Sequence, residues 1–504
     1  MAMFLLSVTA CTKLGPDFVT PEAPIEPRWL EGSHEKLRSE GDFETSWWTQ
    51  FDDAALNKII TRARNQNLSL QVAGLRVLQS RSQLGIAVGN KFPQSQRVTG
   101  GLRQIKLSEN EPNAIPGFQD ESYREANLGF EIGWELDLWG KFARGIEAAN
   151  AELLASVATY DDILVTLCAD VATSYVLIRT FENRLNIANE NVAIQKSSLE
   201  LAETRFRHGA TTELDVQQAR TLLRNTEASI PNLQIGLQQA KNALSTLLGQ
   251  APSDLSALIG EQSDIPSAPA SVATGIPSEL LRRRPDIRRA EHLAAAQSAR
   301  IGIAESALYP QFSLTGSVGF RSSDTFRSDL SDITNLDSLE GLAGPSFSWD
   351  IFNYGRLKNN IRVQDARFQG LLVAYQNTVI RAAQEVEDAM AGFLRASEQI
   401  DLLQDAVEAA RRSVEIALIQ YRDGAVDYQR VLQTQDALVS QQDRLMSTRG
   451  AVARNLIAMY RALGGGWETG ETFLISDQSV AAMKSRTDWD GELDASKRET
   501  EASK

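Results

Sequence analysis

The 504-residue chain is poor in the residues that most often carry out chemistry. It has two cysteines, Cys11 and Cys168, and three histidines that lie far apart and lack the spacing of metal ligands. The His-Glu-x-x-His, Cys-x-x-Cys, Gly-x-Ser-x-Gly and phosphate-loop motifs are absent from the sequence. We therefore expect no catalytic residues, no metal and no dissociable cofactor, and the protein is predicted not to be an enzyme.

The sequence also has no excess of basic residues and no long apolar run. Lysine and arginine number 51 against 65 aspartate and glutamate residues, and the net charge is −14. Because nucleic acid is bound through a basic face, we expect no nucleic-acid partner. A transmembrane helix needs about 18 apolar residues in succession, and no such run is found. A membrane β-strand needs only about ten alternating residues, so a membrane location stays open.

What the chain does contain is a long helical pattern that occurs twice. From Leu164, and again from Val379, small or apolar residues recur at alternating intervals of three and four, which is typical of a coiled-coil seam. About 43 residues of such a helix span roughly 65 Å. Gly209 and Gly424, which can end helices, lie 215 residues apart. The predicted helices are 140–206 and 212–248 in the first copy and 356–422 and 427–463 in the second.

Ahead of each helical pair, the apolar period changes from 3.6 to 2 after a proline, Pro93 in the first copy and Pro310 in the second. The strongest alternation covers 126–138, where even-numbered residues are apolar and odd-numbered residues are polar or glycine. Weaker strands are expected near 95–107, 312–320 and 341–352, which gives β-hairpins at 95–138 and 311–352. The predicted lipid face of the first hairpin comprises Leu128, Phe130, Ile132, Trp134 and Leu136.

This alternation has two interpretations. A soluble protein would bury the apolar face against a core and leave the polar face in water, whereas an outer-membrane barrel would turn the apolar face to lipid. Polar loops near 108–122 and 322–340, and the position of each hairpin between long helices, favour the barrel. A closed barrel needs about eight strands or more, so four strands would close only with those of other chains.

The N-terminal residues MAMFLLSVTAC are either a frayed soluble end or the end of a secretory signal that is cleaved before Cys11. The signal is favoured because Val8-Thr9-Ala10-Cys11 resembles the bacterial lipobox, in which the cysteine receives a lipid. Thr12, rather than an aspartate, follows this cysteine, which in lipoproteins points to the outer membrane. Acyl chains contribute about 0.8 kcal/mol per buried CH₂, so several chains anchor a protein firmly.

The predicted organisation has six segments. These are a signal peptide at 1–10, a Pro-rich, lipid-anchored belt segment at 11–50, a first repeat at 51–249, a joint at 250–280, a second repeat at 281–466 and a flexible tail at 467–504. We expect Trp47, Trp48 and the Arg-Arg-Arg-Pro-Asp segment at 282–286 to pack rather than to bind a ligand. Cys168, inside the helical seam, is expected to be an inert packing thiol.

Several motifs together resemble those of the TolC-like outer-membrane efflux proteins, specifically the lipoprotein branch that serves resistance-nodulation-division (RND) pumps. The resemblance covers nearly the whole chain, and its specificity comes from the combination, because each motif alone is weak. The motifs are Cys11, Gly15-Pro16-Asp17-Phe18, Trp47-Trp48, Leu281-Arg282-Arg283-Arg284-Pro285-Asp286-Ile287, Tyr309-Pro310-Gln311, Tyr421-Arg422-Asp423-Gly424 and Ala462-Leu463-Gly464-Gly465-Gly466-Trp467.

The resemblance implies a mainly α protein with a membrane β part. In a homotrimer, each chain would contribute four strands to one outer-membrane β-barrel and its helices to a long periplasmic α-helical barrel, with an internal two-fold structural repeat. The protein would be a lipid-anchored, passive exit duct for drugs or other small molecules. Its partners would be outer-membrane lipids, a periplasmic adaptor (membrane fusion) protein and an inner-membrane RND pump.

The resemblance also places a gate at the periplasmic tip of the second copy. Three copies of Asp427 and Asp423 would form acidic rings there, and specific pairs with Arg422 and Arg430 would close the aperture. Ordinary solvated carboxylates in a turn are the alternative. The sequence departs from the family pattern at Gln433, where several relatives have an acidic residue.

The turns that carry His208, Gly209 and Gly424 are the expected adaptor contact, because a partner can reach the free end of a tube. Two rival functions stay open. A type I secretion duct for proteins would use the same architecture, and a coiled-coil scaffold lipoprotein would keep the helical pattern without forming a channel. The sequence determines neither the exported substrate nor the cognate pump and adaptor.

Overall fold

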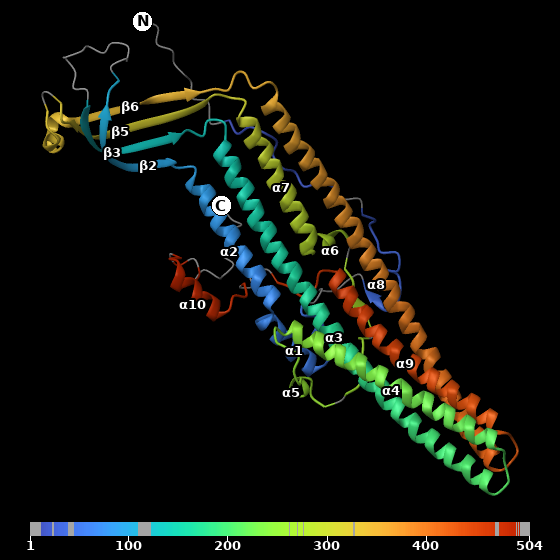
Figure 1. The fold of residues 1–504 in the computed structure, drawn as a ribbon. Coiled ribbons are helices and arrows are strands. Elements are labelled where there is room, and N and C mark those ends of the chain that lie inside the picture. The colour runs from blue at the N-terminus through green and yellow to red at the C-terminus, as the bar shows by residue number, and fades with distance from the viewer. Residues whose placement is uncertain are drawn as a thin grey trace. The chain divides into compact units, whose positions relative to one another are not determined.

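The computed structural model describes residues 12–22, 25–38, 45–108, 122–261, 263–269, 271–275, 277–325, 328–468, 473–489, 491 and 493. The predicted lipidation residue Cys11 and the predicted signal peptide lie outside these residues. Figure 1 shows the course of the chain, which divides into two compact units. Unit 1 comprises Met1–Pro21, Leu78–Ala155 and Ala290–Tyr375, and unit 2 comprises Glu22–Val77, Ser156–Arg289 and Gln376–Lys504.

Unit 1 contains a four-stranded antiparallel sheet, which is labelled in Figure 1. Its strands are β2 (Ser95–Lys106), β3 (Ser122–Glu135), β5 (Gln311–Ser323) and β6 (Leu339–Ser348). The order is β2-β3-β5-β6, so the two predicted hairpins join through β3 and β5. Two 3-10 helices, Leu330–Thr334 and Leu336–Ser338, lie between β5 and β6.

The strand predicted at 126–138 begins and ends earlier than expected, as β3. It ends at Glu135 because Asp137 serves the next helix: its carboxylate accepts the N–H groups of Phe142 at 3.0 Å and Ala143 at 2.8 Å. Leu136, which was predicted to lie in the strand, therefore follows β3 by one residue. Its N–H still donates to the carbonyl oxygen of Phe312 at 2.8 Å.

Two long helical hairpins follow the strands. Helices α3 and α8 have 67 residues each, and α4 and α9 have 35 each. Helix α8 begins 215 residues after α3, and α9 begins 215 residues after α4. Their bounds are α3 (Lys141–Arg207), α4 (Glu213–Leu247), α8 (Arg356–Arg422) and α9 (Tyr428–Ala462). The other helices are α1 (Ala54–Gln66), α2 (Leu68–Gly89), α5 (Ser256–Ile259), α6 (Pro277–Arg283), α7 (Pro285–Ser306) and α10 (Asp477–Arg486).

Helix α3 contains one strongly apolar stretch. It has an 18-residue window of mean hydropathy 1.5, which makes it long and apolar enough to cross a membrane by length and composition. The prediction of no transmembrane helix rested on unbroken apolar runs, and this window does not contradict it. In the structure 72% of this window is buried inside the protein, as in the core helix of a soluble protein, and this packing explains the apolar residues.

The residues predicted to serve packing do so within unit 2. The ring of Trp47 is fully buried and stacks on Tyr460 at 5.3 Å between centroids. Cys168 is buried, and its Sγ lies 4.0 Å from the carbonyl oxygen of Gly466. The Arg284 guanidinium is buried and donates to the carbonyl oxygen of Ala462 at 2.9 Å, so it ties the start of α7 to the end of α9.

Two segments in which no helix or strand was predicted contain short elements. In the predicted belt segment, β1 (Leu37–Arg38) pairs in parallel with β4 (Val272–Ala273), and a 3-10 helix begins at Trp47. The predicted C-terminal tail includes α10, a helix that the sequence pattern did not predict. The side chain of Ser476 caps α10 by accepting the N–H of Ser479 at 3.3 Å, which is the local signal that the analysis overlooked.

Candidate functional site

The sheet of unit 1 has one exposed apolar face. Residues directly opposite in an antiparallel pair share a face, and the register places Val98 opposite Phe130, which in turn lies opposite Val318. These three side chains are 76%, 41% and 51% exposed. Other exposed apolar residues in the same alternation are Leu102, Leu128, Ile132, Leu314, Leu339 and Phe347.

The opposite face of the same sheet is mainly polar. Glu131 accepts a hydrogen bond from Thr99 at 3.3 Å. The guanidinium of Arg321 lies 3.1 Å from Glu340 and 3.8 Å from Glu125, so charged groups cross-link the strands on this face. Leu342 is an exposed apolar exception. A sheet with one solvated polar face and one exposed apolar face lacks the covering core that a soluble protein would supply.

Tryptophan side chains lie where the strands meet the helices. The indole N–H of Trp139 donates to the carbonyl oxygen of Pro310 at 2.8 Å, and that of Trp349 donates to the carbonyl of Leu308 at 2.9 Å. Trp134, predicted on the lipid face, is half-buried and donates to the carbonyl of Lys91 at 3.2 Å. Indoles with a satisfied N–H and an apolar body suit a membrane–water boundary.

The second candidate region is the pair of turns at the ends of the helical hairpins, in unit 2. Gly209 and Gly424 have φ of +71° and +78°, which is the left-handed conformation of a helix-ending glycine. Both glycines and the neighbouring His208 are exposed, so the predicted adaptor-contact residues are accessible in this chain. The two turns lie close together, since the Arg205 guanidinium bonds to carbonyl groups of both.

The predicted aperture residues lie on the second turn. Arg422 Nε is 3.7 Å from Asp423 Oδ1, and both side chains are about two-thirds exposed. Asp427 is the N-cap residue of α9 and is exposed, and its carbonyl oxygen accepts the N–H of Arg430 at 3.4 Å. Among the described residues, the Asp427 carboxylate forms no salt bridge with Arg430 or Arg422, so the chain brings together one of the predicted charge pairs.

The sequence analysis missed Arg205, which joins the two turns. Its Nη1 donates to the carbonyl oxygens of Tyr421 at 2.5 Å and Arg422 at 2.7 Å, and its Nη2 donates to that of Ala210 at 3.3 Å. The guanidinium also lies 4.8 Å from the centre of the Tyr421 ring. A basic residue in the last turn of a helix was the available signal, because the last carbonyl groups there lack helical partners.

Next to Arg205, a small core of the tip surrounds two tyrosines. The Tyr421 and Tyr428 rings pack edge to face at 5.3 Å, and the Tyr421 hydroxyl donates to Asp215 at 3.2 Å. Thr211 also donates to this carboxylate. Burial raises the pKa of both tyrosine hydroxyls above the ordinary value. Small or apolar buried residues complete the cluster: Ala202, Val216, Ala219, Ala417 and Val431.

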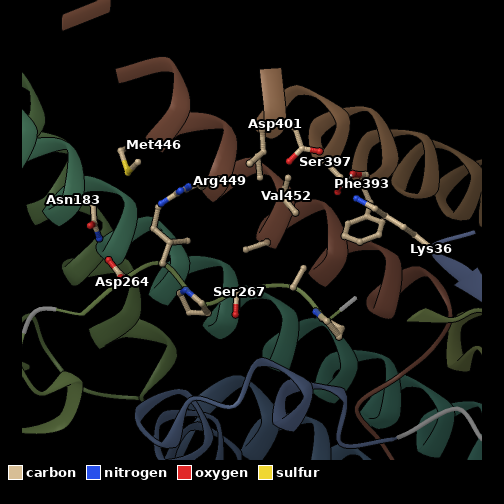
Figure 2. A pocket seen from close by; sticks show the side chains of 16 residues that line it. Lys36, Asn183, Asp264, Ser267, Phe393, Ser397, Asp401, Met446, Arg449 and Val452 are labelled. Atoms are coloured by element: carbon tan, nitrogen blue, oxygen red, sulfur yellow. Dashed lines mark hydrogen bonds between the residues drawn. The ribbon is translucent and has the colours of Figure 1, made fainter. Parts of the chain in front are cut away.

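Unit 2 also contains a cavity of about 490 Å³, shown in Figure 2. Phe393, Met446 and Val452 supply apolar lining, and Asp264 and Arg449 supply charge. Among the residues that the structure describes, no group of histidine, cysteine, aspartate and glutamate could hold a metal ion. The lining residues form no acid–base or nucleophile arrangement.

The outer membrane efflux protein family model matches residues 59–250 and 276–465. The solvent efflux pump outer membrane protein SrpC of Pseudomonas putida is 30% identical over 480 residues, covering 94% of this chain and 99% of SrpC. The cation efflux system protein CusC of Escherichia coli is 29% identical, covering 92% of this chain and 97% of CusC. The solved structure of the outer-membrane channel OprN matches with a TM-score of 0.84 and 31% identity, covering 90% of this chain and 99% of OprN.

These matches span both helical hairpins and both strand pairs. They favour a duct over the coiled-coil scaffold, which the helical pattern alone had left open. The matched family consists of membrane channels and is not a family of enzymes. The two-faced sheet fits the same conclusion, because an efflux channel must present an apolar surface to lipid. The chain belongs to the outer membrane efflux protein family, and it acts as an efflux channel of the outer membrane that extends into the periplasm.

Proposed function

We propose that the protein is the lipid-anchored, homotrimeric exit duct of a tripartite efflux pump. The observation that carries the proposal is a four-stranded sheet with an exposed apolar face and, among the described residues, two edge strands that each pair on one side. Unpaired edges are a liability that closure removes. Twelve strands from three chains would close one barrel, with the apolar face toward lipid and the polar face toward a water-filled lumen.

The height of the apolar band supports a membrane-spanning barrel. Along β3 and its extension, the apolar positions run from Ala126 to Leu136. Ten residues rise about 33 Å along a strand, and a tilt of about 40° reduces this to roughly 25 Å across the membrane, the height of a typical barrel's apolar band. The tryptophans at the helical end of the sheet would then lie at the periplasmic boundary.

The tip would gate the duct. Three copies of Asp423 and Asp427 would surround the axis and favour the entry of cations, and Arg422 and Arg430 would contribute the closing pairs. The exposed turns at His208, Gly209 and Gly424 would contact the periplasmic adaptor. Arg205 supports this role, because its hydrogen bonds hold the two turns as one surface.

The proposed partners are a periplasmic adaptor and an inner-membrane RND pump that supplies the energy. SrpC is named for solvent efflux and CusC for cation efflux, although both are about equally similar to this chain. The substrate is therefore set by the partner pump rather than by the duct. A lipid on Cys11 would hold the N-terminal segment at the outer membrane.

Reconstitution in a planar bilayer tests the proposal. Purified protein should give stepwise ion currents, and Asp427→Ala should raise the closed-state conductance because the pairs that would close the aperture lose their acidic partner. Asp477→Ala, an exposed change on α10 outside the tip, is the matched control and should leave conductance unchanged. Protein that gives no currents and is removed from membranes by carbonate would contradict the channel. A closed-state conductance that Asp427→Ala does not alter would contradict the aperture assignment alone.

A further inference from the structure

Unit 1 holds the N-terminal segment 13–20 by contacts that neither the channel nor the gate requires. At their centre, Arg144 is 1% exposed although it carries a charge. Its Nε donates to the carbonyl oxygen of Leu14 at 2.8 Å and its Nη2 to that of Gly15 at 2.8 Å. Its Nη1 lies 2.9 Å from Glu147 and 3.0 Å from Asp17. The buried guanidinium thus depends on the segment for most of its hydrogen bonds.

The fit of the segment is sterically specific. Gly15 has φ of +82°, and a Cβ atom added there would lie 2.4 Å from the Cα atom of Gly302 on α7. A Cβ atom on Gly302 would in turn lie 2.4 Å from the carbonyl oxygen of Leu14. A residue larger than glycine at either position would force the two backbones apart. We call Arg144, Glu147 and Gly302, with the segment that they hold, the clamp.

Contacts on both sides extend the clamp along the segment. The Leu14 N–H donates to the carbonyl oxygen of Trp139 at 3.2 Å, which places the start of the segment at the turn between β3 and α3. Lys13 pairs with Glu147 at 2.5 Å. Further along, the Phe18 ring packs edge to face on Phe368 of α8 at 6.4 Å. The segment therefore contacts α3, α7 and α8 within unit 1.

The position of the clamp has a consequence for the N-terminal anchor. Trp139 follows Leu136, where the apolar face of the sheet ends. Cys11 precedes Leu14 by three residues, which reach at most about 10 Å. We propose that Arg144 is a positioning residue for the lipid anchor: the clamp, rather than the lipid, fixes where the N-terminal segment leaves the protein, at the edge of the apolar face. The lipid part of this inference rests on the proposed lipidation of Cys11.

Hydrogen exchange of the Leu14 amide in the detergent-solubilised full chain tests the clamp. Arg144→Met removes the donors to the segment, and Gly15→Ala disturbs the segment without changing a helix. Each should speed exchange of this amide at least tenfold. Cys11→Ala should change it less than threefold. Arg300→Met is the matched control, because Arg300 on α7 pairs with Glu152 on α3 without contacting the segment. If Arg144→Met does not fold, Gly15→Ala still decides the outcome.

A distance measurement tests the positioning itself. Spin labels at Thr12→Cys and Ser313→Cys should give a narrow distance distribution in the parent protein and in Cys11→Ala, and a distribution at least twice as wide in Arg144→Met. Loss of order in Cys11→Ala together with retention in Arg144→Met and Gly15→Ala would overturn the proposal. The intact mass of the parent protein shows separately whether Cys11 carries acyl chains, so failure of the lipidation proposal is distinguishable from failure of the clamp.

Discussion

Single side chains hold the two tip turns together. Arg205 reaches the carbonyl groups that end α8, and a carboxylate on α4, Asp215, accepts the Tyr421 hydroxyl. Helix-ending carbonyl groups need donors from outside the helix, and an arginine supplies several in a fixed plane. These contacts join residues more than 200 positions apart in the sequence, so they couple the first helical hairpin to the second.

Replacing Arg205 by methionine should loosen this coupling. The change removes three hydrogen bonds and a cation–π contact from a partly exposed site, and we expect it to destabilise the tip by about 1–3 kcal/mol. Hydrogen exchange at 205–215 and 421–428 should rise accordingly, and the closed-state conductance should increase. Arg412→Met is the control: Arg412 pairs with Glu415 along the same helix, both side chains are exposed, and such pairs contribute about 0–1 kcal/mol. Equal effects of the two changes would contradict the role of Arg205.

Because the Tyr428 hydroxyl is buried, we expect the tip to lose stability at alkaline pH. Burial raises the pKa of its hydroxyl, so the neutral form is favoured in the folded protein. An exposed tyrosine ionises near pH 10. The resulting stabilisation is therefore complete below about pH 10 and is lost as the pH rises through the folded-state pKa. Tyr428→Phe should remove this part of the pH dependence, measured as the free energy of local opening by hydrogen exchange.

At neutral pH the same change should be neutral or stabilising by up to about 1 kcal/mol, because the buried Tyr428 hydroxyl makes no hydrogen bond among the described residues. Tyr421→Phe is the matched control. It removes the bond to Asp215 and should destabilise the tip by about 1 kcal/mol. Destabilisation by Tyr428→Phe as large as that by Tyr421→Phe would show that the Tyr428 hydroxyl has a partner after all.

At the scale of whole helices, glycines set how closely the hairpins pack. A Cβ atom on Gly450 of α9 would lie 2.3 Å from Thr180 Oγ1 of α3. Phe181 is the next residue of α3, and a Cβ atom on Gly236 of α4 would lie 2.5 Å from its ring. Helix α3 therefore contacts both neighbours through glycine at one level. Between this level and the apolar core of the tip, α3 and α9 also form polar contacts, as between Asn191 and Gln442 at 2.8 Å.

Gly450→Ala should consequently destabilise unit 2 by about 1–3 kcal/mol through overpacking. Adding Thr180→Ala should restore most of the loss, because it removes the atoms that clash. Gly145→Ala on α3 meets no atom within 4 Å and is the control; it should be neutral or stabilising by about 0.5–1 kcal/mol. Denaturant unfolding of these variants, and of Thr180→Ala alone, measures these differences. Additive losses in the double variant would contradict the contact.

At the scale of the whole molecule, the sheet leaves one apolar face uncovered and two strand edges unpaired among the described residues. Its apolar face is exposed in the chain, and its outer strands β2 and β6 have neighbours on one side among the described residues. Exposed apolar residues also lie along α8, including Val363, Val373 and Ile380. In the proposed trimer, lipid would cover the apolar face of the sheet, and further copies would lie beside its edges and the helices.

Phe130→Arg should prevent membrane assembly. Phe130 lies in the middle of the exposed apolar face, where arginine costs about 2–4 kcal/mol per chain at the bilayer midplane. Ser317→Arg is the control, since Ser317 lies on the polar face opposite Glu131, where a cation is tolerated. The fraction of detergent-resistant oligomer recovered from membranes measures both variants. Normal recovery of Phe130→Arg would show that this face does not meet lipid.

The sequence by itself determined the elements. The heptad seam and the helix-ending glycines predicted all four long helices to within one residue of their observed ends, because coiled-coil period and left-handed glycine are properties of neighbouring residues. Alternation likewise predicted which residues of β3 share a face. The end of β3 was misplaced, because Asp137 accepts hydrogen bonds from the next helix rather than continuing the ladder.

Only the tertiary structure decided which distant groups meet. No local pattern joins β3 to β5, Arg205 to the carbonyl of Tyr421, or Arg144 to the carbonyls of residues 14 and 15. Each is a contact between groups more than 100 residues apart. The sequence does not show whether an arginine donates its hydrogen bonds to water or to distant backbone carbonyl groups. Period and turn geometry are local and can be read along the chain, whereas the partner of a buried polar group is fixed by packing once the chain has folded.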